Sequence, residues 1–305
     1  MILERGITAL CLGIDILKLK QNDEILLPDK ICDDIIGMLK FKNIKPIYYS
    51  LNSDLSPKWA SVNKIMEHPN NIKAILMIHY FGQPQDISNF IDFKIKHNIF
   101  LIEDNAHGHG GYYNNILLGK YGDIGISSPR KMLDLNTVGI LFLNNTTFNF
   151  PLDLPKGVKI SYFSAYARKL QFYFPKLRSL LLYIKNISKT SKQVLNTDYS
   201  IKSADKYSEK KYLNSNWDKI AYNRRSNWIL WTNYMNDFGL RPIFNLCNTS
   251  SPWAIPFYIE SEIEFNKWIS WANKKGNIFF LWPNITFSTN SRQIMCIRLD
   301  IKPHF

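Results

Sequence analysis

The sequence predicts an α/β fold with a mainly parallel β-sheet at its core and helices on both faces of the sheet. Short apolar segments of strand length alternate with amphipathic segments of helical length through the first half of the chain, as in proteins built from βαβ units. In addition, an uninterrupted apolar run at residues 99–102 ends abruptly in Glu103 and Asp104. Such a run is typical of a buried parallel strand that delivers polar side chains to a site at its C-terminal end.

The composition is that of a globular protein. The chain has 305 residues, enough for one large and one small domain, with 46% hydrophobic and 21% charged residues. No apolar run reaches the roughly 18 residues of a membrane span, and the first residues do not form a secretory signal, so we expect a cytoplasmic protein. Cys11, Cys32, Cys247 and Cys296 have neither paired nor metal-type spacing, which predicts buried free thiols and no metal site.

The elements of the first hundred residues alternate between helix and strand. Residues 5–17 are predicted to form a loop that turns into an amphipathic helix. After it we expect strands at 23–28, 45–50 and 74–82 and helices at 31–39, 57–68 and 90–97. This alternation indicates parallel strands, whose carboxyl ends lie at one edge of the sheet.

A second polar turn follows the strand that ends at Asp104. It begins at Gly122 and carries Ser128 and Lys131, and another apolar segment follows at 138–143. If strands flank this turn, an amine and hydroxyls lie near the same sheet edge as the carboxylate. A pyridoxal phosphate enzyme needs a lysine for the aldehyde, a carboxylate that keeps the pyridine nitrogen protonated, and hydroxyls for the phosphate. Taken alone, Lys131 is also explained as an ordinary solvated lysine.

Four motifs resemble the DegT/StrS family of pyridoxal phosphate-dependent sugar aminotransferases, in that family's order and at nearly its spacing. They are His79-Tyr80-Phe81-Gly82-Gln83-Pro84, Ile102-Glu103-Asp104-Asn105-Ala106-His107-Gly108-His109-Gly110, Gly122-Asp123-Ile124-Gly125 and Ser128-Pro129-Arg130-Lys131. The resemblance covers about residues 5–145, with a weaker similarity in the last third. The short turn before Lys131 resembles a divergent branch that has Ser-x-Arg-Lys.

This resemblance implies an aspartate aminotransferase-like fold (fold type I): a large domain with a mainly parallel sheet, and a small C-terminal α+β domain. We expect a pyridoxal phosphate-binding domain at 1–150, a basic, aromatic-rich helical connection at 151–216 and the small domain at 217–305. The resemblance further implies a homodimer with pyridoxal 5'-phosphate as cofactor. Its expected reaction moves an amino group from an amino acid donor, glutamate, to a keto sugar, nucleotide-linked, for surface polysaccharides.

The resemblance also suggests roles for individual residues. Lys131 would hold the cofactor and move the proton, and Asp104 would sustain the positive charge of the ring. His107 would lie near the phenolic oxygen, and Gly6, Ile7 and Thr8 would form a helix N-terminus that binds the phosphate. Cys32 stands where many relatives place a stacking aromatic residue. The remaining cofactor-binding residues implied are Ser128 and His79.

Several of these residues have simpler interpretations. The turn at residues 6–8 could be an ordinary helix start, and Cys32 a core cysteine. Tyr80 and Phe81 could be core aromatic residues. For a loop histidine such as His107 a structural role is a standing alternative, and His109 has no assigned role.

The positive charge is concentrated in the middle of the chain. Residues 1–150 carry 15 basic and 15 acidic side chains, 151–225 carry 16 and 5, and 226–305 carry 7 and 5, which gives excesses of 0, +11 and +2 and the net charge of +13. Residues 160–187 have the pattern of helices with an apolar face and a basic flank. We expect packing on the large domain or a second subunit. The alternative is peripheral contact of 156–225 with an anionic membrane; nucleic acid is disfavoured, because no binding motif accompanies the charge.

The last third predicts a compact α+β unit. We expect a helix from Trp217 to Phe238, a strand at 254–259, a helix at 262–275 closed by Gly276, and a strand at 278–283. Before it, residues 196–202 lie roughly where the family carries Gly-Tyr-Asn-Tyr-Arg, whose Asn reaches the phosphate of the neighbouring subunit. Here Ser200 and Lys202 would stand in.

A second hypothesis is a catalytically vestigial protein with a binding, regulatory or membrane-surface role. The chain begins close to the phosphate turn, Ile7 replaces a usual polar residue, Cys32 replaces an aromatic one, and the second-subunit motif matches poorly. The retained Asp104 and Lys131 oppose this hypothesis, because relaxed selection would not be expected to spare both.

Overall fold

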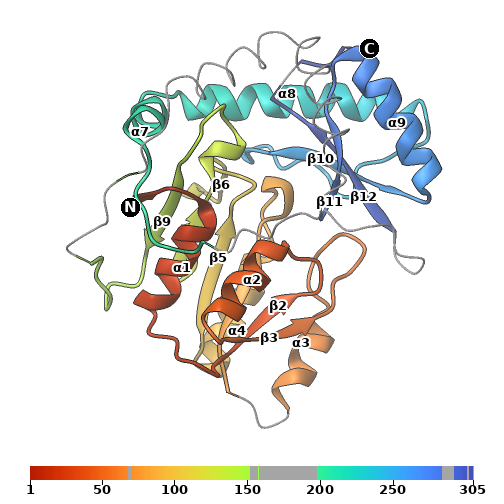
Figure 1. The fold of residues 1–305 in the computed structure, drawn as a ribbon. Helices are drawn as coiled ribbons and strands as arrows, with labels where there is room; N and C mark the ends of the chain where they lie inside the picture. Colours follow the sequence, from red (N-terminus) through yellow and green to blue (C-terminus); the bar gives the residue numbers. More distant parts are fainter. Residues whose placement is uncertain (68–70, 152–156, 158–197, 284–291, 301, 305) are drawn as a thin grey trace.

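A seven-stranded mixed sheet forms the centre of the fold (Figure 1). The computed structural model describes residues 1–305 except 68–70, 152–156, 158–197, 284–291, 301 and 305. The strands of the sheet are β1 (Ile2–Leu3), β2 (Glu24–Pro28), β3 (Lys45–Tyr49), β4 (Ile72–Ile78), β5 (Phe100–Asn105), β8 (Ile124–Ser127) and β9 (Gly139–Leu143). Their order is β1-β9-β8-β5-β4-β2-β3. The neighbours from β3 to β8 are parallel, and only β9 and β1 make antiparallel pairs, which confirms the predicted mainly parallel sheet.

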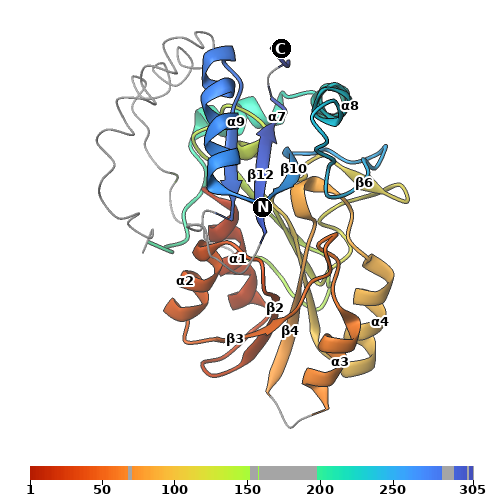
Figure 2. The same cartoon turned by 90° about the vertical axis from the view of Figure 1, so that its right-hand side faces the viewer.

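Helices cover both faces of this sheet, as predicted. They are α1 (Gly6–Ile16), α2 (Asp33–Phe41), α3 (Trp59–Met66) and α4 (Ile87–His97). Figure 2 shows α1 and α2 on one face and α3 and α4 on the other. Because both faces are covered, the central strands are largely buried, and this explains their mostly apolar sequences.

Strand β5 lies at the centre of the sheet, between β4 and β8. Its register pairs Asp104 with Ile78 of β4 on one side and with Ile126 of β8 on the other. The carboxyl ends of these three parallel strands therefore meet at one edge. The short helical turns η1 (Tyr80–Gly82) and η2 (Pro129–Lys131) follow β4 and β8 at this edge, and a small hairpin of β6 (Tyr112–Tyr113) and β7 (Ile116–Leu117) lies between β5 and β8 in the sequence.

The last third forms the predicted α+β unit. It contains α8 (Trp217–Asn236), β10 (Ala254–Ile259), α9 (Glu262–Lys275), β11 (Phe279–Trp282) and β12 (Gln293–Arg298), and is preceded by α7 (Lys206–Leu213) in the segment predicted as a connection. The strands form an antiparallel sheet in the order β10-β12-β11, packed on α8 and α9 through Trp231, Phe257 and Met295. Strand β12, the central one, was not predicted. The predicted end of α9 is confirmed, because Gly276 adopts a left-handed conformation there, with φ of 76°.

The N-terminus packs against the chain just before α7. The backbone N–H of Glu4 donates to the carbonyl oxygen of Lys202 at 2.9 Å, and Leu3 forms a bridge with Ser203. The predicted basic helices at 160–187 lie outside the described residues. Within the described ranges, no helix combines the length and the apolar character needed to cross a bilayer.

The four cysteines are free thiols, as expected. Cys11 and Cys296 are buried, but Cys32 is exposed and Cys247 half-buried. The expectation that all four are buried was therefore wrong for two of them, because Cys32 caps the start of α2 and Cys247 belongs to the loop before β10.

Candidate active site

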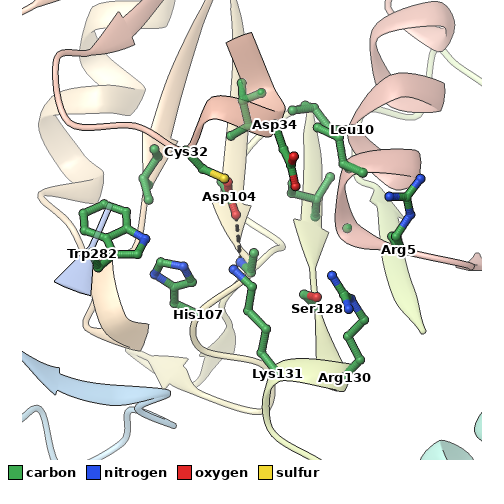
Figure 3. A pocket seen from close by; sticks show the side chains of 16 residues that line it. Arg5, Leu10, Cys32, Asp34, Asp104, His107, Ser128, Arg130, Lys131 and Trp282 are labelled. Carbon is green, nitrogen blue, oxygen red and sulfur yellow. Dashed lines mark hydrogen bonds between the residues drawn. The ribbon is translucent and has the colours of Figure 1, made fainter. Parts of the chain in front are cut away.

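A pocket of about 640 Å³, including space open to solvent, lies at the carboxyl edge of the parallel strands. It is the position at which open α/β sheets bind ligands. Figure 3 shows Asp104 and Lys131 near its middle, with Cys32 and Trp282 on one side and Arg5 and Arg130 on the other. The pocket thus combines the end of β5, the start of α1, the turn η2 and the end of β11.

Asp104 is a buried carboxylate at this edge. It is 6% exposed, and its Oδ1 accepts a hydrogen bond from the backbone N–H of Ala106 at 2.8 Å (Figure 3). Burial raises the pKa of Asp104, while the Ala106 amide and the charge of Lys131 lower it in part. Among the described residues, no cation forms an ion pair with this carboxylate. Because a buried carboxylate is costly without a cationic partner, the site favours a ligand that brings a positive group to Asp104.

Lys131 ends the turn η2, which Pro129 opens at the first helical position. The turn follows β8 directly, so that the lysine side chain rises into the pocket beside Asp104 (Figure 3). Burial lowers the pKa of Lys131, and the nearby Asp104 and Cys32 oppose this change. A lowered pKa increases the fraction of neutral amine, which is the form that attacks a carbonyl carbon.

His107 lines the same pocket from the loop after β5. Its Nδ1 accepts the backbone N–H of Phe81 at 3.3 Å. Burial, reinforced by the charge of Lys131, lowers the pKa of His107 well below its usual value, so the ring is neutral near pH 7. A neutral ring that accepts at Nδ1 carries its proton on Nε2. His107 therefore retains one N–H donor for a ligand.

The opposite end of the pocket suits an anion. Gly6 and Ile7, at the N-terminus of α1, line it together with Ser128. Ser128 is 2% exposed, and a Cβ at Gly6 would lie 3.4 Å from the Ser128 Cβ, so the helix start and the serine are in close contact. A helix N-terminus offers free N–H groups and a positive dipole end. Arg5 and Arg130, which also line the pocket, add positive charge.

Two predicted residues lie outside the pocket lining. Thr8 is fully buried behind the helix start, and its Oγ1 has no hydrogen-bond partner among the described residues. His79 is also fully buried, and its Nε2 lies 2.8 Å from Oε1 of Glu103, while its Nδ1 accepts the N–H of Gln85. His79 thus supports β5 by a bond to Glu103, whose neighbour Asp104 serves the pocket.

The remaining histidine and the segment proposed to act across subunits also lie elsewhere. His109 Nδ1 lies 2.9 Å from Ser127 Oγ, its ring packs on Trp217, and burial lowers its pKa to about 3; it joins β8 to α8. Lys202 pairs with Asp198 at 2.6 Å on the surface. Neither Lys202 nor Ser200 belongs to the pocket lining.

Sequence reasoning missed the contribution of the C-terminal unit. Trp282 of β11 lines the pocket and packs edge-on against His107, with ring centroids 5.6 Å apart. Trp253, just before β10, lies beside Lys131, whose Nζ is 4.9 Å from the centroid of its ring. Both tryptophans lie more than a hundred residues from Lys131 in the sequence, and no local pattern marks them.

Comparison with known proteins finds a family that the N-terminal part of the chain resembles. Residues 3–149 match the model of the DegT/DnrJ/EryC1/StrS aminotransferase family. Among curated proteins, the chain is 28% identical over 145 residues to the GDP-perosamine synthase of Escherichia coli O157:H7, and this match covers 47% of this chain and 39% of that protein. The chain is also 27% identical over 120 residues to the GDP-perosamine synthase of Vibrio cholerae, and that match covers 39% of this chain and 32% of that protein. The matched part therefore spans less than half the length of either relative.

Solved structures share the fold over nearly the whole chain. An aminotransferase of the same family from Brucella abortus superimposes with a TM-score of 0.66 at 14% identity, covering 98% of this chain and 80% of that one. The GDP-4-keto-6-deoxy-D-mannose-3-dehydratase of E. coli, solved with hydrated PLP, gives a TM-score of 0.63 at 16% identity and covers 99% and 84%. These likenesses confirm the predicted fold class. Residues 3–149, just under half of the chain, are similar to the DegT/DnrJ/EryC1/StrS aminotransferase family.

Proposed function

We propose that this protein is a pyridoxal phosphate-dependent aminotransferase that moves an amino group from an amino acid to a keto sugar. The observation that carries the proposal is the meeting of Lys131, Asp104 and His107 in one pocket, with an anion-binding helix start at its other end. The cofactor, when bound, supplies an aldehyde that accepts amines and an aromatic ring that withdraws electrons from the reacting carbon. The residues present fit its groups, because no cation among the described residues forms an ion pair with the buried carboxylate, and the anion-binding end is lined by arginines and a helix start.

Each residue has a distinct role in this proposal. Asp104 receives the protonated ring nitrogen, which offsets the cost of its buried charge. His107 donates Nε2–H to the phenolic oxygen. Gly6, Ile7 and Ser128 hold the phosphate, and Thr8 supports that helix start from within. Cys32 lies at the edge of the ring site, and His79 acts only by way of Glu103 and β5.

Lys131 has two tasks. With the cofactor bound, Lys131 would hold it, because a neutral amine can condense with an aldehyde with loss of water and can be exchanged for the amine of the donor. The freed amine of Lys131 would then carry a proton between the α-carbon of the donor and the cofactor carbon. Burial supports both tasks, because it lowers the pKa of the lysine and thereby provides a neutral base.

We further propose glutamate as donor and a nucleotide-linked keto sugar as acceptor, in the biosynthesis of surface polysaccharides. The support is the naming of both curated relatives as GDP-perosamine synthases. The same proposal includes a homodimer, which light scattering tests, and a cytoplasmic location, which cell fractionation tests. It also includes peripheral contact of residues 156–225 with anionic membranes, which vesicle flotation tests. The alternative of a vestigial protein is not favoured, since the pocket retains both Asp104 and Lys131.

The deciding experiment is capture of the cofactor by Lys131. The purified chain is incubated with pyridoxal phosphate, its visible spectrum is recorded, and borohydride reduction is followed by peptide mass spectrometry. We expect a new absorption band and a pyridoxyl group on the peptide that contains Lys131. Lys131→Arg keeps the positive charge but cannot form the bond, so it should show neither. Lys120→Arg, at an exposed lysine, is the matched control and should behave as wild type.

A transamination assay then tests the reaction itself. The chain with its cofactor is mixed with glutamate and a panel of nucleotide-linked 4-keto sugars, and 2-oxoglutarate and the amino sugar are measured together. Formation of both products in equal amounts supports the proposal. Capture of the cofactor without either product would instead support the vestigial alternative.

A further inference from the structure

The amine of Lys131 lies over an aromatic ring contributed by the C-terminal unit. We propose that Trp253 is a positioning residue, whose indole face holds the amine of Lys131 at the pocket when that amine is unbonded and protonated, and that Arg224 fixes this arrangement. The inference rests on the proposed function for its role in the reaction. Its geometry, however, exists in the chain without any cofactor.

The first observation is the contact itself. Nζ of Lys131 lies 4.9 Å from the centroid of the Trp253 ring, within the distance at which a cation is attracted by the face of an indole. The same ring packs on His107, with centroids 4.5 Å apart. Trp253 therefore touches two of the three residues proposed to act on the cofactor.

The second observation is that the backbone of Trp253 is fixed on both sides. Its N–H points at two carbonyl oxygens, those of His107 at 3.0 Å and Phe81 at 3.2 Å. Its own carbonyl oxygen accepts a hydrogen bond from Nη1 of Arg224 at 3.0 Å. The backbone that carries the ring is therefore held in place beside the lysine.

The third observation is that one guanidinium connects both members of the pair. Arg224 of α8 is 2% exposed. Its Nη1 donates to the carbonyls of Trp253 and Pro252, and its Nη2 donates to that of Met132 at 2.7 Å. Met132 directly follows Lys131, so Arg224 holds the turn that carries Lys131 and the segment that carries Trp253 at a constant separation. Burial lowers the pKa of Arg224 to about 10, and it stays charged near pH 7.

The contact counteracts the effect of burial on Lys131. Burial and Arg130 favour the neutral amine, whereas Asp104, Cys32 and Asp34 favour the charged one; His107 beside it is neutral. A ring face also favours the charged amine. Trp253 thus allows a displaced, protonated lysine to remain beside the pocket instead of extending into solvent, and it holds that proton where the reacting carbon would lie.

The test measures Lys131 in the full-length chain without cofactor. Lysines are reductively methylated with ¹³C-formaldehyde, and the signal absent from Lys131→Arg is followed by NMR as the pH is raised. In Trp253→Leu we expect the pKa of Lys131 to fall by roughly 0.5 to 1.5, the free energy of a cation–π contact expressed as a pKa change. Trp268→Leu removes a tryptophan from the C-terminal aromatic cluster, where Trp268 packs on Phe238 and Trp271, and should leave that pKa unchanged.

Two further variants keep the test decisive if Trp253→Leu does not fold. Trp253→Phe retains a weaker ring and should lower the pKa in the same direction by a smaller amount. Arg224→Lys keeps the charge but cannot span three carbonyls, and it should also lower the pKa of Lys131. Its neighbour Arg225, which donates to the carbonyl of Ser250, gives the control Arg225→Lys.

An unchanged or raised pKa of Lys131 in the folded Trp253 variants would overturn the inference. Because the measurement needs no cofactor, this outcome is distinct from failure of the proposed function. If the wild-type chain captures pyridoxal phosphate and the pKa of Lys131 is unaltered in the Trp253 variants, only the role of Trp253 is refuted. A chain that captures no cofactor refutes the proposed function, and the lysine titration still decides whether Trp253 holds the amine.

Discussion

Glu103 and Asp104 are neighbours in β5, yet their carboxylates lie in two different environments. Asp104 lines the pocket and accepts one backbone N–H, from Ala106. Glu103 accepts hydrogen bonds from the backbone N–H groups of Gly119, Tyr121 and Gly122 and lies 2.8 Å from His79 Nε2. Successive side chains of a strand point to opposite faces, so one carboxylate is left for a ligand while the other is saturated by the protein.

Replacement of Asp104 by Asn should raise the stability of the cofactor-free chain and lower its activity. Burial raises the pKa of Asp104, so folding favours its protonated form, and the ionised form costs free energy above that raised pKa. The amide keeps the bond from Ala106 without this cost. We therefore expect cofactor-free Asp104→Asn to be more stable than wild type to urea at pH 7.5, with the gain disappearing below the ordinary value of 3.8. Transamination should fall by about 100-fold or more.

A loss of stability in Asp104→Asn would contradict this expectation. If cofactor-free Asp104→Asn is less stable than wild type at pH 7.5, the carboxylate already has a stabilising partner inside the protein. The pocket would then hold no unmet negative charge for a cationic ring, which the proposed function requires.

Replacement of Glu103 by Gln should have the opposite effect on stability. Burial alone would raise the pKa of Glu103, but the bonds from His79, Gly119 and Gly122 outweigh it and the pKa is lowered. Its stabilisation is thus present above the unfolded value near 4.5 and is lost as the pH falls through the folded pKa. In Gln, an NH₂ group would face backbone donors. We expect a loss of about 3 kcal/mol at pH 7.

Urea unfolding over a range of pH checks this expectation. The difference between wild type and Glu103→Gln should shrink as the pH is lowered below 4.5, the ordinary value for a glutamate. Glu67→Gln, at an exposed residue, should stay within about 0.5 kcal/mol of wild type at every pH. A Glu103→Gln variant as stable as wild type would mean that the network around His79 does not support β5.

The fold was largely predictable because its signals are local. The apolar runs of β2, β4 and β5 and the polar residues at their ends follow from burial of a parallel sheet. The elements that were missed depend on distant partners. Strand β12 is stabilised between β10 and β11, and β1 has only two residues and is held by β9 and by Ser203.

Two things limited prediction of the site: the sheet face on which each side chain lies, and the separation along the sequence of residues that meet in the fold. Ile78, the last residue of β4, lines the pocket, whereas His79, the next residue along the chain, does not. Because side chains alternate along an extended chain, a difference of one position changes the face. Asp104, His107, Ser128 and Lys131 meet in the pocket because they lie at or just after the ends of β5 and β8. Trp282 lines the pocket, and Trp253 lies beside Lys131, only through packing of the C-terminal unit, which no spacing along the chain encodes.

Ser128→Ala should weaken binding of the phosphate but not of the ring. A hydrogen bond to a charged group contributes about 1.5 to 3 kcal/mol, so we expect roughly 10- to 100-fold weaker affinity for pyridoxal phosphate. Affinity for pyridoxal, which has no phosphate, should be unchanged, and equilibrium titration followed by absorbance measures both. Ser88→Ala, on the exposed face of α4, is the control. An equal loss for both ligands would show that Ser128 acts on the ring or on the turn of Lys131 instead.

Gly82→Ala should disturb the pocket through the backbone. Gly82 has a φ of +84°, and a Cβ there would lie 2.6 Å from the carbonyl oxygens of His107 and Ser251. Those atoms belong to the segments that carry His107 and Trp253, so neither can move without displacing a side chain of the site. We expect a loss of about 2 to 5 kcal/mol, from the left-handed backbone and from overpacking together, and weaker capture of pyridoxal phosphate.

Gly239→Ala isolates the backbone part of this cost. Gly239 has a φ of +75°, and a Cβ added there would have no atom within 4 Å, so only the conformational penalty of about 1 to 2 kcal/mol applies. Urea unfolding of the two variants gives the difference, which measures how tightly the turn after β4 is packed against the loops of His107 and Ser251. Equal losses in the two variants would mean that these loops give way readily and that the pocket is not held rigid from this side.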